Sequence, residues 1–137
     1  MSSNYSINFN TPKRSKKLIK FIIIHYTGMK SQAKAIERLC DSSSKVSAHY
    51  FIKDNGKLLN LVPDLYEAWH AGKSSWKNLK ALNKYSIGIE INNSGHDYGY
   101  PKFKKRQIST LKKLLKNLIN KYKIRNRNIL GHSDIAP

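Results

Sequence analysis

A continuous apolar stretch that ends in a histidine is the feature of this sequence that most restricts its fold. Residues 21–24 read Phe-Ile-Ile-Ile and lead directly into His25, followed by tyrosine, threonine and glycine. A strand without polar alternation is typical of a sheet that is covered on both faces. We therefore predict that residues 17–25 form a buried strand of an α/β domain, and that its last residue presents an imidazole where the strand ends.

The elements that follow alternate between helix and strand patterns. Ser31 is expected to cap a helix that runs to about Cys40. Residues 48–62 form two strand-like runs around Asn55-Gly56, the strongest short hairpin signal. Residues 66–85 have a mixed pattern and are expected to form a long loop, of the kind that often carries function.

The second half of the chain is predicted to hold a strand, a long helix and a final short strand. Residues 85–92 alternate as a strand in which Gly88 permits close backbone approach. Residues 104–122 have apolar side chains at helical spacing and lysines on the other face. We expect a basic lead-in at residues 1–16 and one domain at residues 17–137, with a mixed central β-sheet flanked by helices.

The charge of the chain is strongly unbalanced, with 26 Lys and Arg against 8 Asp and Glu and a net charge of +18. Such a chain attracts nucleic acid, anionic membrane or acidic wall polymer. Alternatively, its lysines fill solvated positions, because they are spread along the whole sequence. The single cysteine excludes an internal disulfide and a Cys-based zinc cluster.

No apolar run is long enough to span a membrane, and the N-terminal residues lack the hydrophobic segment of a signal peptide. The expected location is therefore cytoplasmic, with the periplasm or envelope as the alternative if the protein is exported by another route.

Two histidines share one context, since His25 follows an apolar strand and His132 follows the short strand Asn-Ile-Leu-Gly. Ligands of open α/β sheets bind where strands end. Neutral imidazole is a common metal ligand, and a catalytic zinc needs three protein ligands and an open position. The pair indicates a metal site, although each histidine alone would be an ordinary strand-end residue.

Glu90 places an acid inside an apolar strand, where acids rarely lie without a partner or a role. With isoleucines at 87, 89 and 91 on one face, Glu90 lies on the other. If that face opens into the site, Glu90 can take a proton from a reacting water. The alternative is a salt bridge to one of the many lysines.

Five segments in this order resemble one enzyme family: IIIHYTG, SAHYFI, AWHAGKSSW, YSIGIEI and GHSDIAP. Together they are similar to the zinc-dependent N-acetylmuramoyl-L-alanine amidases of type 2. This family includes the bacterial AmpD/AmiD branch, the lysozyme of phage T7 and the peptidoglycan recognition proteins. The resemblance covers residues 20–137 and implies the type 2 amidase fold, shared with the peptidoglycan recognition proteins.

The resemblance also implies roles for single residues. His25 and His132 match the two zinc-ligand histidines, and Glu90 matches the acid that activates water. His70 and Asn83 match substrate-binding positions near the muramyl peptide. In the AmpD/AmiD branch the third zinc ligand is an aspartate shortly after the last segment, so we expect it beyond Pro137 and the domain to be truncated at its C-terminal end.

The predicted function is hydrolysis of the amide between N-acetylmuramic acid and the L-Ala of the stem peptide. The substrate is peptidoglycan or a 1,6-anhydro-muropeptide, the cofactor is Zn²⁺, and we expect a monomer. The alternative is a non-catalytic module that binds peptidoglycan or muropeptides, because the third ligand is missing from residues 1–137. No recognised nucleic-acid motif supports a nucleic-acid partner.

Overall fold

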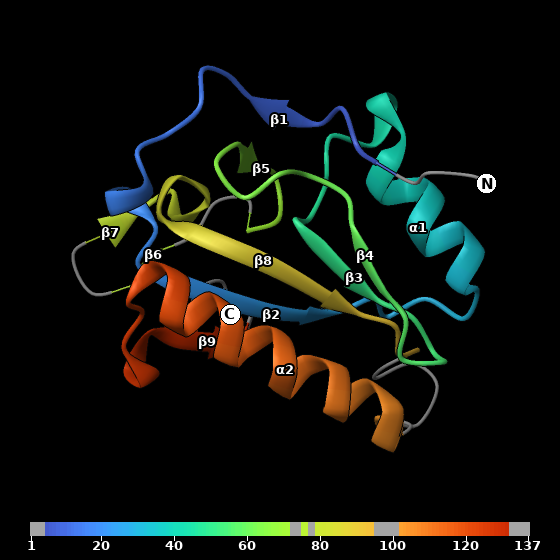
Figure 1. Ribbon diagram of the computed structural model, residues 1–137. Helices are drawn as coiled ribbons and strands as arrows, with labels where there is room; N and C mark the ends of the chain where they lie inside the picture. The colour runs from blue at the N-terminus through green and yellow to red at the C-terminus, as the bar shows by residue number, and fades with distance from the viewer. Residues whose placement is uncertain (1–4, 72–74, 77–78, 95–101, 132–137) are drawn as a thin grey trace.

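The computed structural model describes residues 5–71, 75–76, 79–94 and 102–131, and a five-stranded sheet lies at its centre (Figure 1). The strands, in spatial order, are β4 (Leu58–Asn60), β3 (Tyr50–Ile52), β8 (Ser86–Ile91), β2 (Phe21–Tyr26) and β9 (Ile129–Gly131). Strands β3, β8, β2 and β9 are parallel, and β4 is antiparallel to β3. The predicted mixed sheet is confirmed.

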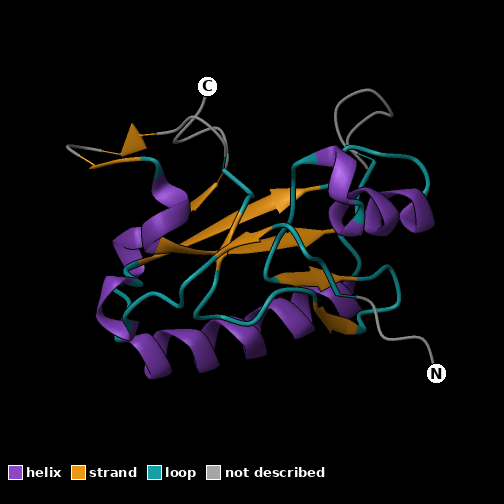
Figure 2. Ribbon diagram, turned by 90° about the horizontal axis from the view of Figure 1, so that it is seen from above, coloured by secondary structure: helices purple, strands orange, loops and turns teal. Residues whose placement is uncertain are grey.

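The two faces of the sheet are covered by different elements. One face packs the alternate isoleucines of β2 and β8 against helix α2 (Lys105–Tyr122). On the other face, Phe51 packs against helix α1 (Gln32–Cys40), and Phe21 and Ile23 form a second apolar cluster. Figure 2 shows α2 and α1 on opposite sides of the sheet. Cover on both faces explains why Phe21–Ile24 is an unbroken apolar run.

Local signals in the sequence explain where the larger elements begin and turn. The Ser31 hydroxyl accepts a hydrogen bond from the backbone N–H of Lys34 at 3.2 Å and caps α1, as predicted. Gly56 turns the β3–β4 hairpin with a φ of +86°, a conformation that favours glycine. The predicted long helix is confirmed as α2.

The segment predicted as a long loop contains short elements instead. They are β5 (Glu67–Ala68), β6 (Ser75–Trp76), β7 (Leu79–Lys80) and the 3-10 turn η3 (Leu82–Tyr85). Strands of two residues are too short to produce a recognisable alternation, so the sequence pattern could not reveal them. The described residues also form the 3-10 turns η1 (Lys16–Leu18), η2 (Ser42–Ser44) and η5 (Asn126–Asn128).

The described part of the basic lead-in packs against the domain. Strand β1 (Phe9–Asn10) pairs with β5. Asn8 is buried, and its side-chain amide donates to the carbonyl oxygens of Asp41 and Val46, each at 2.8 Å. Residues 6–10 therefore belong to the folded domain, and they lead the chain toward Arg14.

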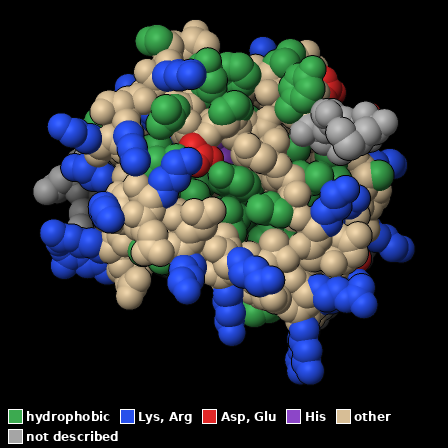
Figure 3. All heavy atoms as spheres, viewed as in Figure 1, with side chains coloured by type: hydrophobic (Ala, Val, Ile, Leu, Met, Phe, Trp, Pro, Cys, Tyr) green, Lys and Arg blue, Asp and Glu red, His purple; other side chains and the backbone are tan. Residues whose placement is uncertain are grey.

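The basic side chains are distributed rather than concentrated. Figure 3 shows Lys and Arg scattered over the face that carries α2. On that helix Lys112, Lys113 and Lys116 are exposed, while Leu114 and Leu118 face the core. This arrangement fits lysines at solvated positions. Neither described helix combines the length and the apolar character that a membrane crossing requires.

Candidate active site

His25 and Glu90 are neighbours on adjacent parallel strands. The register pairs the Cα atom of His25 on β2 with that of Glu90 on β8. Residues paired in this way point to the same face of a sheet, and adjacent strands lie about 4.8 Å apart. The isoleucines of β8 pack against α2 on one face of the sheet. Glu90 lies on the other face, as the alternation predicted. The structure therefore brings the predicted ligand and the predicted acid together near the carboxyl ends of two central strands.

Glu90 is held in a setting that favours its neutral form. The residue is partly exposed, and burial of its carboxyl group raises its pKa to about 8, against the opposing effect of the positive charge of Arg38 on α1. Among the described residues the ion pairs are Lys104–Asp54 and Lys121–Asp64, so the alternative of a lysine partner for Glu90 finds no support there. A carboxyl group with a pKa near neutrality is suited to accept and return protons.

His70 links the end of β2 to the start of β8. Its Nδ1 lies 3.0 Å from Nε2 of His25, and its Nε2 lies 2.9 Å from the hydroxyl oxygen of Ser86. The two imidazole rings meet edge to face, with ring centroids 5.2 Å apart. His70 thus contacts the predicted metal ligand directly. Its predicted role in substrate binding stays a prediction.

The ring of His70 lies on Gly88. A Cβ atom at position 88 would lie 2.6 Å from Cδ2 and 2.7 Å from Nδ1 of His70, distances that no side chain tolerates. Gly88 therefore does lie at a close approach, but the group that approaches its backbone is the side chain of His70. His49, which is fully buried, contacts the same glycine. Its Nδ1 accepts a hydrogen bond from the Gly88 N–H at 3.0 Å, and its Nε2 donates to the Tyr66 carbonyl at 2.7 Å. Burial lowers the pKa of His49 to about 4, so it stays neutral.

Asn83 holds the backbone of the turn that carries His70. Its side-chain oxygen accepts hydrogen bonds from the N–H groups of His70 at 3.3 Å and Ala71 at 2.8 Å. Contact between Asn83 and a muramyl peptide stays a prediction. In the structure, Asn83 fixes the main chain beside His70 through these two hydrogen bonds.

Arg14 stabilises the main chain of the same region through hydrogen bonds. Its guanidinium donates to three backbone carbonyl oxygens, those of Ser86 at 2.7 Å, Asn83 at 2.8 Å and Asp64 at 2.9 Å. Burial lowers the pKa of Arg14 to about 10, and the nearby groups of Glu67, Tyr122 and Asp64 oppose the shift. Arg14 therefore connects the N-terminal segment to the start of β8. This role leaves no signal in the sequence, because Arg14 is one of several basic residues in the same segment.

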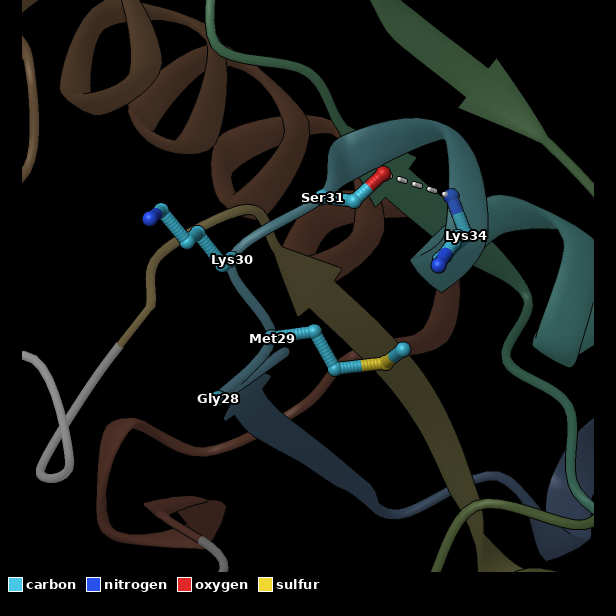
Figure 4. A pocket seen from close by; sticks show the side chains of 5 residues that line it. All are labelled: Gly28, Met29, Lys30, Ser31 and Lys34. Atoms are coloured by element: carbon cyan, nitrogen blue, oxygen red, sulfur yellow. Dashed lines mark hydrogen bonds between the residues drawn. The ribbon is translucent and has the colours of Figure 1, made fainter.

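An open pocket of about 440 Å³ lies just beyond the strand that carries His25. Figure 4 shows the residues that line it, at the start of α1. They are Gly28, Met29, Lys30, Ser31 and Lys34. The two lysines and the amino-terminal end of α1 make this pocket electropositive.

His132 lies outside the described residues, so its predicted position is not tested. Strand β9 ends at Gly131, which pairs with Ile24, the residue before His25. Strand β9 therefore ends level with Ile24, two residues before the end of β2. Within the described ranges, no three His, Cys, Asp or Glu side chains group closely enough to hold a metal ion. His25 has the imidazole nitrogens that Zn²⁺ binds, so it would fit one ligand position of a zinc site.

The raised pKa of Glu90 predicts a pH-dependent stability of the metal-free protein. Folding raises this pKa from 4.5 to about 8, so the folded state favours protonated Glu90. The stability that protonated Glu90 gives to the folded state is therefore present at acid pH and is lost as the pH rises from 4.5 to about 8. Glu90→Gln cannot ionise. We expect it to gain stability over the natural protein by up to about 1.4 kcal/mol per pH unit across the window.

Urea denaturation with a chelator present, at both ends of the window, measures this difference. Glu37→Gln, on the exposed side of α1, is the matched control and should change the free energy of unfolding by less than about 0.5 kcal/mol. A Glu90→Gln difference that does not change with pH would contradict the prediction.

Comparison with known proteins places this site in a family. The model of the N-acetylmuramoyl-L-alanine amidase family, Amidase_2, matches residues 14–137. The amidase AmiD of Escherichia coli is 37% identical over 131 residues, which cover 87% of this chain and 46% of AmiD. The 1,6-anhydro-N-acetylmuramyl-L-alanine amidase AmpD of Citrobacter freundii is 36% identical over 94 residues, which cover 68% of this chain and 48% of AmpD. The chain thus spans about half the length of these relatives.

A solved structure has the same fold. AmiD of E. coli, in complex with the substrate anhydro-N-acetylmuramic acid-L-Ala-D-γ-Glu-L-Lys, superposes with a TM-score of 0.80 at 34% sequence identity, and the match covers 93% of this chain and 53% of AmiD. The predicted resemblance and the predicted fold are both confirmed. The chain belongs to the N-acetylmuramoyl-L-alanine amidase family.

Proposed function

We propose that this chain carries the active site of a zinc-dependent amidase that cuts muropeptides. The bond would be the amide between N-acetylmuramic acid and the L-Ala of the stem peptide. The observation that supports this most directly is the pairing of His25 with Glu90 on neighbouring strands, with the pKa of Glu90 raised to about 8. The identity to AmiD and AmpD, which are amidases by name, supports the same conclusion.

The proposed metal ligands in this chain are His25 and His132. When bound, Zn²⁺ would polarise the scissile carbonyl and make a water molecule a stronger nucleophile at neutral pH. Glu90 would accept the proton of the attacking water on its carboxylate. It would then return that proton to the nitrogen of the leaving L-Ala, so that a neutral amine departs.

The surroundings of Glu90 suit both halves of this proton transfer. A carboxylate with an ordinary pKa would be a weaker base toward the attacking water, because base strength rises with pKa. Burial raises the pKa of Glu90 in the metal-free protein, and a bound cation would lower it again. The carboxyl group would therefore titrate in a range where it can both take and give a proton.

The pocket at the start of α1 is a candidate seat for the peptide part of the substrate. It follows His25 in the chain and is lined by Lys30 and Lys34. These ammonium groups would attract the carboxylates of an acidic stem peptide. Peptidoglycan and 1,6-anhydro-muropeptides share this peptide, so the pocket is compatible with either.

Incubation of the zinc-supplemented protein with a muramyl tripeptide tests the function. We expect mass spectrometry to detect a free peptide with L-Ala at its amino terminus, and none with His25→Ala. Parallel assays on the 1,6-anhydro form and on intact peptidoglycan identify the preferred substrate. If the peptide binds without being cut, the chain is a muropeptide-binding module, which was the alternative from the sequence.

A further inference from the structure

A hydrogen-bond chain with a fixed direction leads from a backbone carbonyl to the imidazole of His70. The Leu82 carbonyl oxygen carries no hydrogen, so the Ser86 hydroxyl donates to it, over 2.7 Å. That hydroxyl has one hydrogen, so in its 2.9 Å contact with Nε2 of His70 the imidazole is the donor. The proton of neutral His70 therefore lies on Nε2.

The same reasoning extends to His25. In a neutral imidazole one nitrogen donates and the other accepts. Because Nε2 of His70 carries the hydrogen, its Nδ1 is an acceptor, and Nε2 of His25, at 3.0 Å, donates to it. His25 is thus held in the tautomer that has its lone pair on Nδ1, which is the form that can bind a metal through that atom.

The surroundings of His70 keep this chain of bonds in place. The absence of a side chain at Gly88 lets the ring lie against β8. Asn83 fixes the main chain of His70, and Arg14 fixes the carbonyl groups of Asn83 and Ser86. Donor and acceptor positions are therefore set before any metal or substrate arrives.

We propose that Ser86 and His70 are positioning residues that select the metal-binding tautomer of His25. This inference rests on the proposed zinc-dependent function. Histidine ligands of metals usually donate their second N–H to a fixed acceptor, and loss of such a partner typically lowers metal affinity about 10- to 100-fold. Here the acceptor chain ends on a neutral carbonyl instead of a carboxylate, so it orients His25 without adding negative charge to the site.

The tautomer can be observed directly in the metal-free protein. Long-range ¹H–¹⁵N correlation spectra distinguish imidazole nitrogens that carry a hydrogen from those that do not. We expect His25 and His70 to be protonated on Nε2 and unprotonated on Nδ1 at a pH where both are neutral. Protonation of His25 on Nδ1 would overturn the proposal, whatever the activity of the protein.

Three variants test the effect on the metal. His70→Phe fills the same space without an acceptor, and Ser86→Ala removes the anchor of the His70 tautomer. We expect each to lower Zn²⁺ affinity about 10- to 100-fold, as measured by competition with a chromophoric chelator. His70→Asn keeps an acceptor oxygen close to the position of Nδ1, so it should retain most of the affinity.

The control is Thr110→Val, which also removes a hydroxyl that donates to a backbone carbonyl, that of Gly56, but lies on α2. It should leave Zn²⁺ affinity unchanged. If His25→Ala binds Zn²⁺ as tightly as the natural protein, the proposed zinc site is wrong. If His25→Ala loses Zn²⁺ while His70→Phe and Ser86→Ala keep it, the site stands and the positioning role is overturned. A fall for His70→Asn equal to that for His70→Phe would also contradict it.

Discussion

Glu90→Gln should reduce amide hydrolysis by about 10²- to 10⁴-fold while the protein folds and binds Zn²⁺ normally. The amide has nearly the same shape as the carboxyl group but cannot take a proton from water, and general base catalysis contributes this factor. The structure supports a specific role for this acid, because it is paired with His25 in the sheet and has its pKa raised to about 8. Steady-state assays with saturating Zn²⁺ measure the effect.

Two further measurements make the result for Glu90 specific. Glu37→Gln, an exposed acid on α1, should keep full activity. Bound zinc, determined by atomic absorption, should be equal in Glu90→Gln and the natural protein. Full hydrolysis by Glu90→Gln would show that another group is the base, whereas loss of zinc would make Glu90 a ligand.

Arg14→Met should destabilise the protein by about 3 kcal/mol or more. Methionine fills much of the same volume but leaves the carbonyl oxygens of Asp64, Asn83 and Ser86 without their donor. Each buried acceptor left unpaired costs about 1–3 kcal/mol. The expected result is a lower urea midpoint with an unchanged dependence on urea concentration.

Arg127→Met is the matched control for this effect. Arg127 is exposed in the turn η5, so its replacement should change the free energy of unfolding by less than about 0.5 kcal/mol. Arg14→Lys keeps the charge but lacks the planar set of donors, and it should fall between the two. Equal midpoints for Arg14→Met and Arg127→Met would show that the three carbonyl contacts contribute little.

Local patterns in the sequence were sufficient for the main elements of the sheet. The unbroken apolar run before His25 predicted a covered strand, and the alternation around Glu90 predicted which face the acid occupies. Both predictions depend only on how neighbouring side chains alternate along a strand. The cap at Ser31 and the turn at Gly56 were predictable for the same reason.

The contacts that organise the site were not predictable from local patterns. The pairing of His25 with Glu90 depends on the register between two strands that lie more than sixty residues apart. Ser86 looks like any polar residue at the start of a strand, and Arg14 looks like any cation of a basic segment. Their roles arise from tertiary hydrogen bonds, which leave no periodic signal in the sequence.

The central position of β2 and β8 in the sheet determines how often the backbone of the site opens. Each of these strands has a strand on both sides, whereas β4 and β9 form the edges. Amide hydrogens of central strands exchange with solvent only in the largest opening events, while edges open locally and often. The backbone that carries His25 and Glu90 is therefore expected to be among the last parts of the sheet to open. The two residues remain side by side while the edge strands open and close locally.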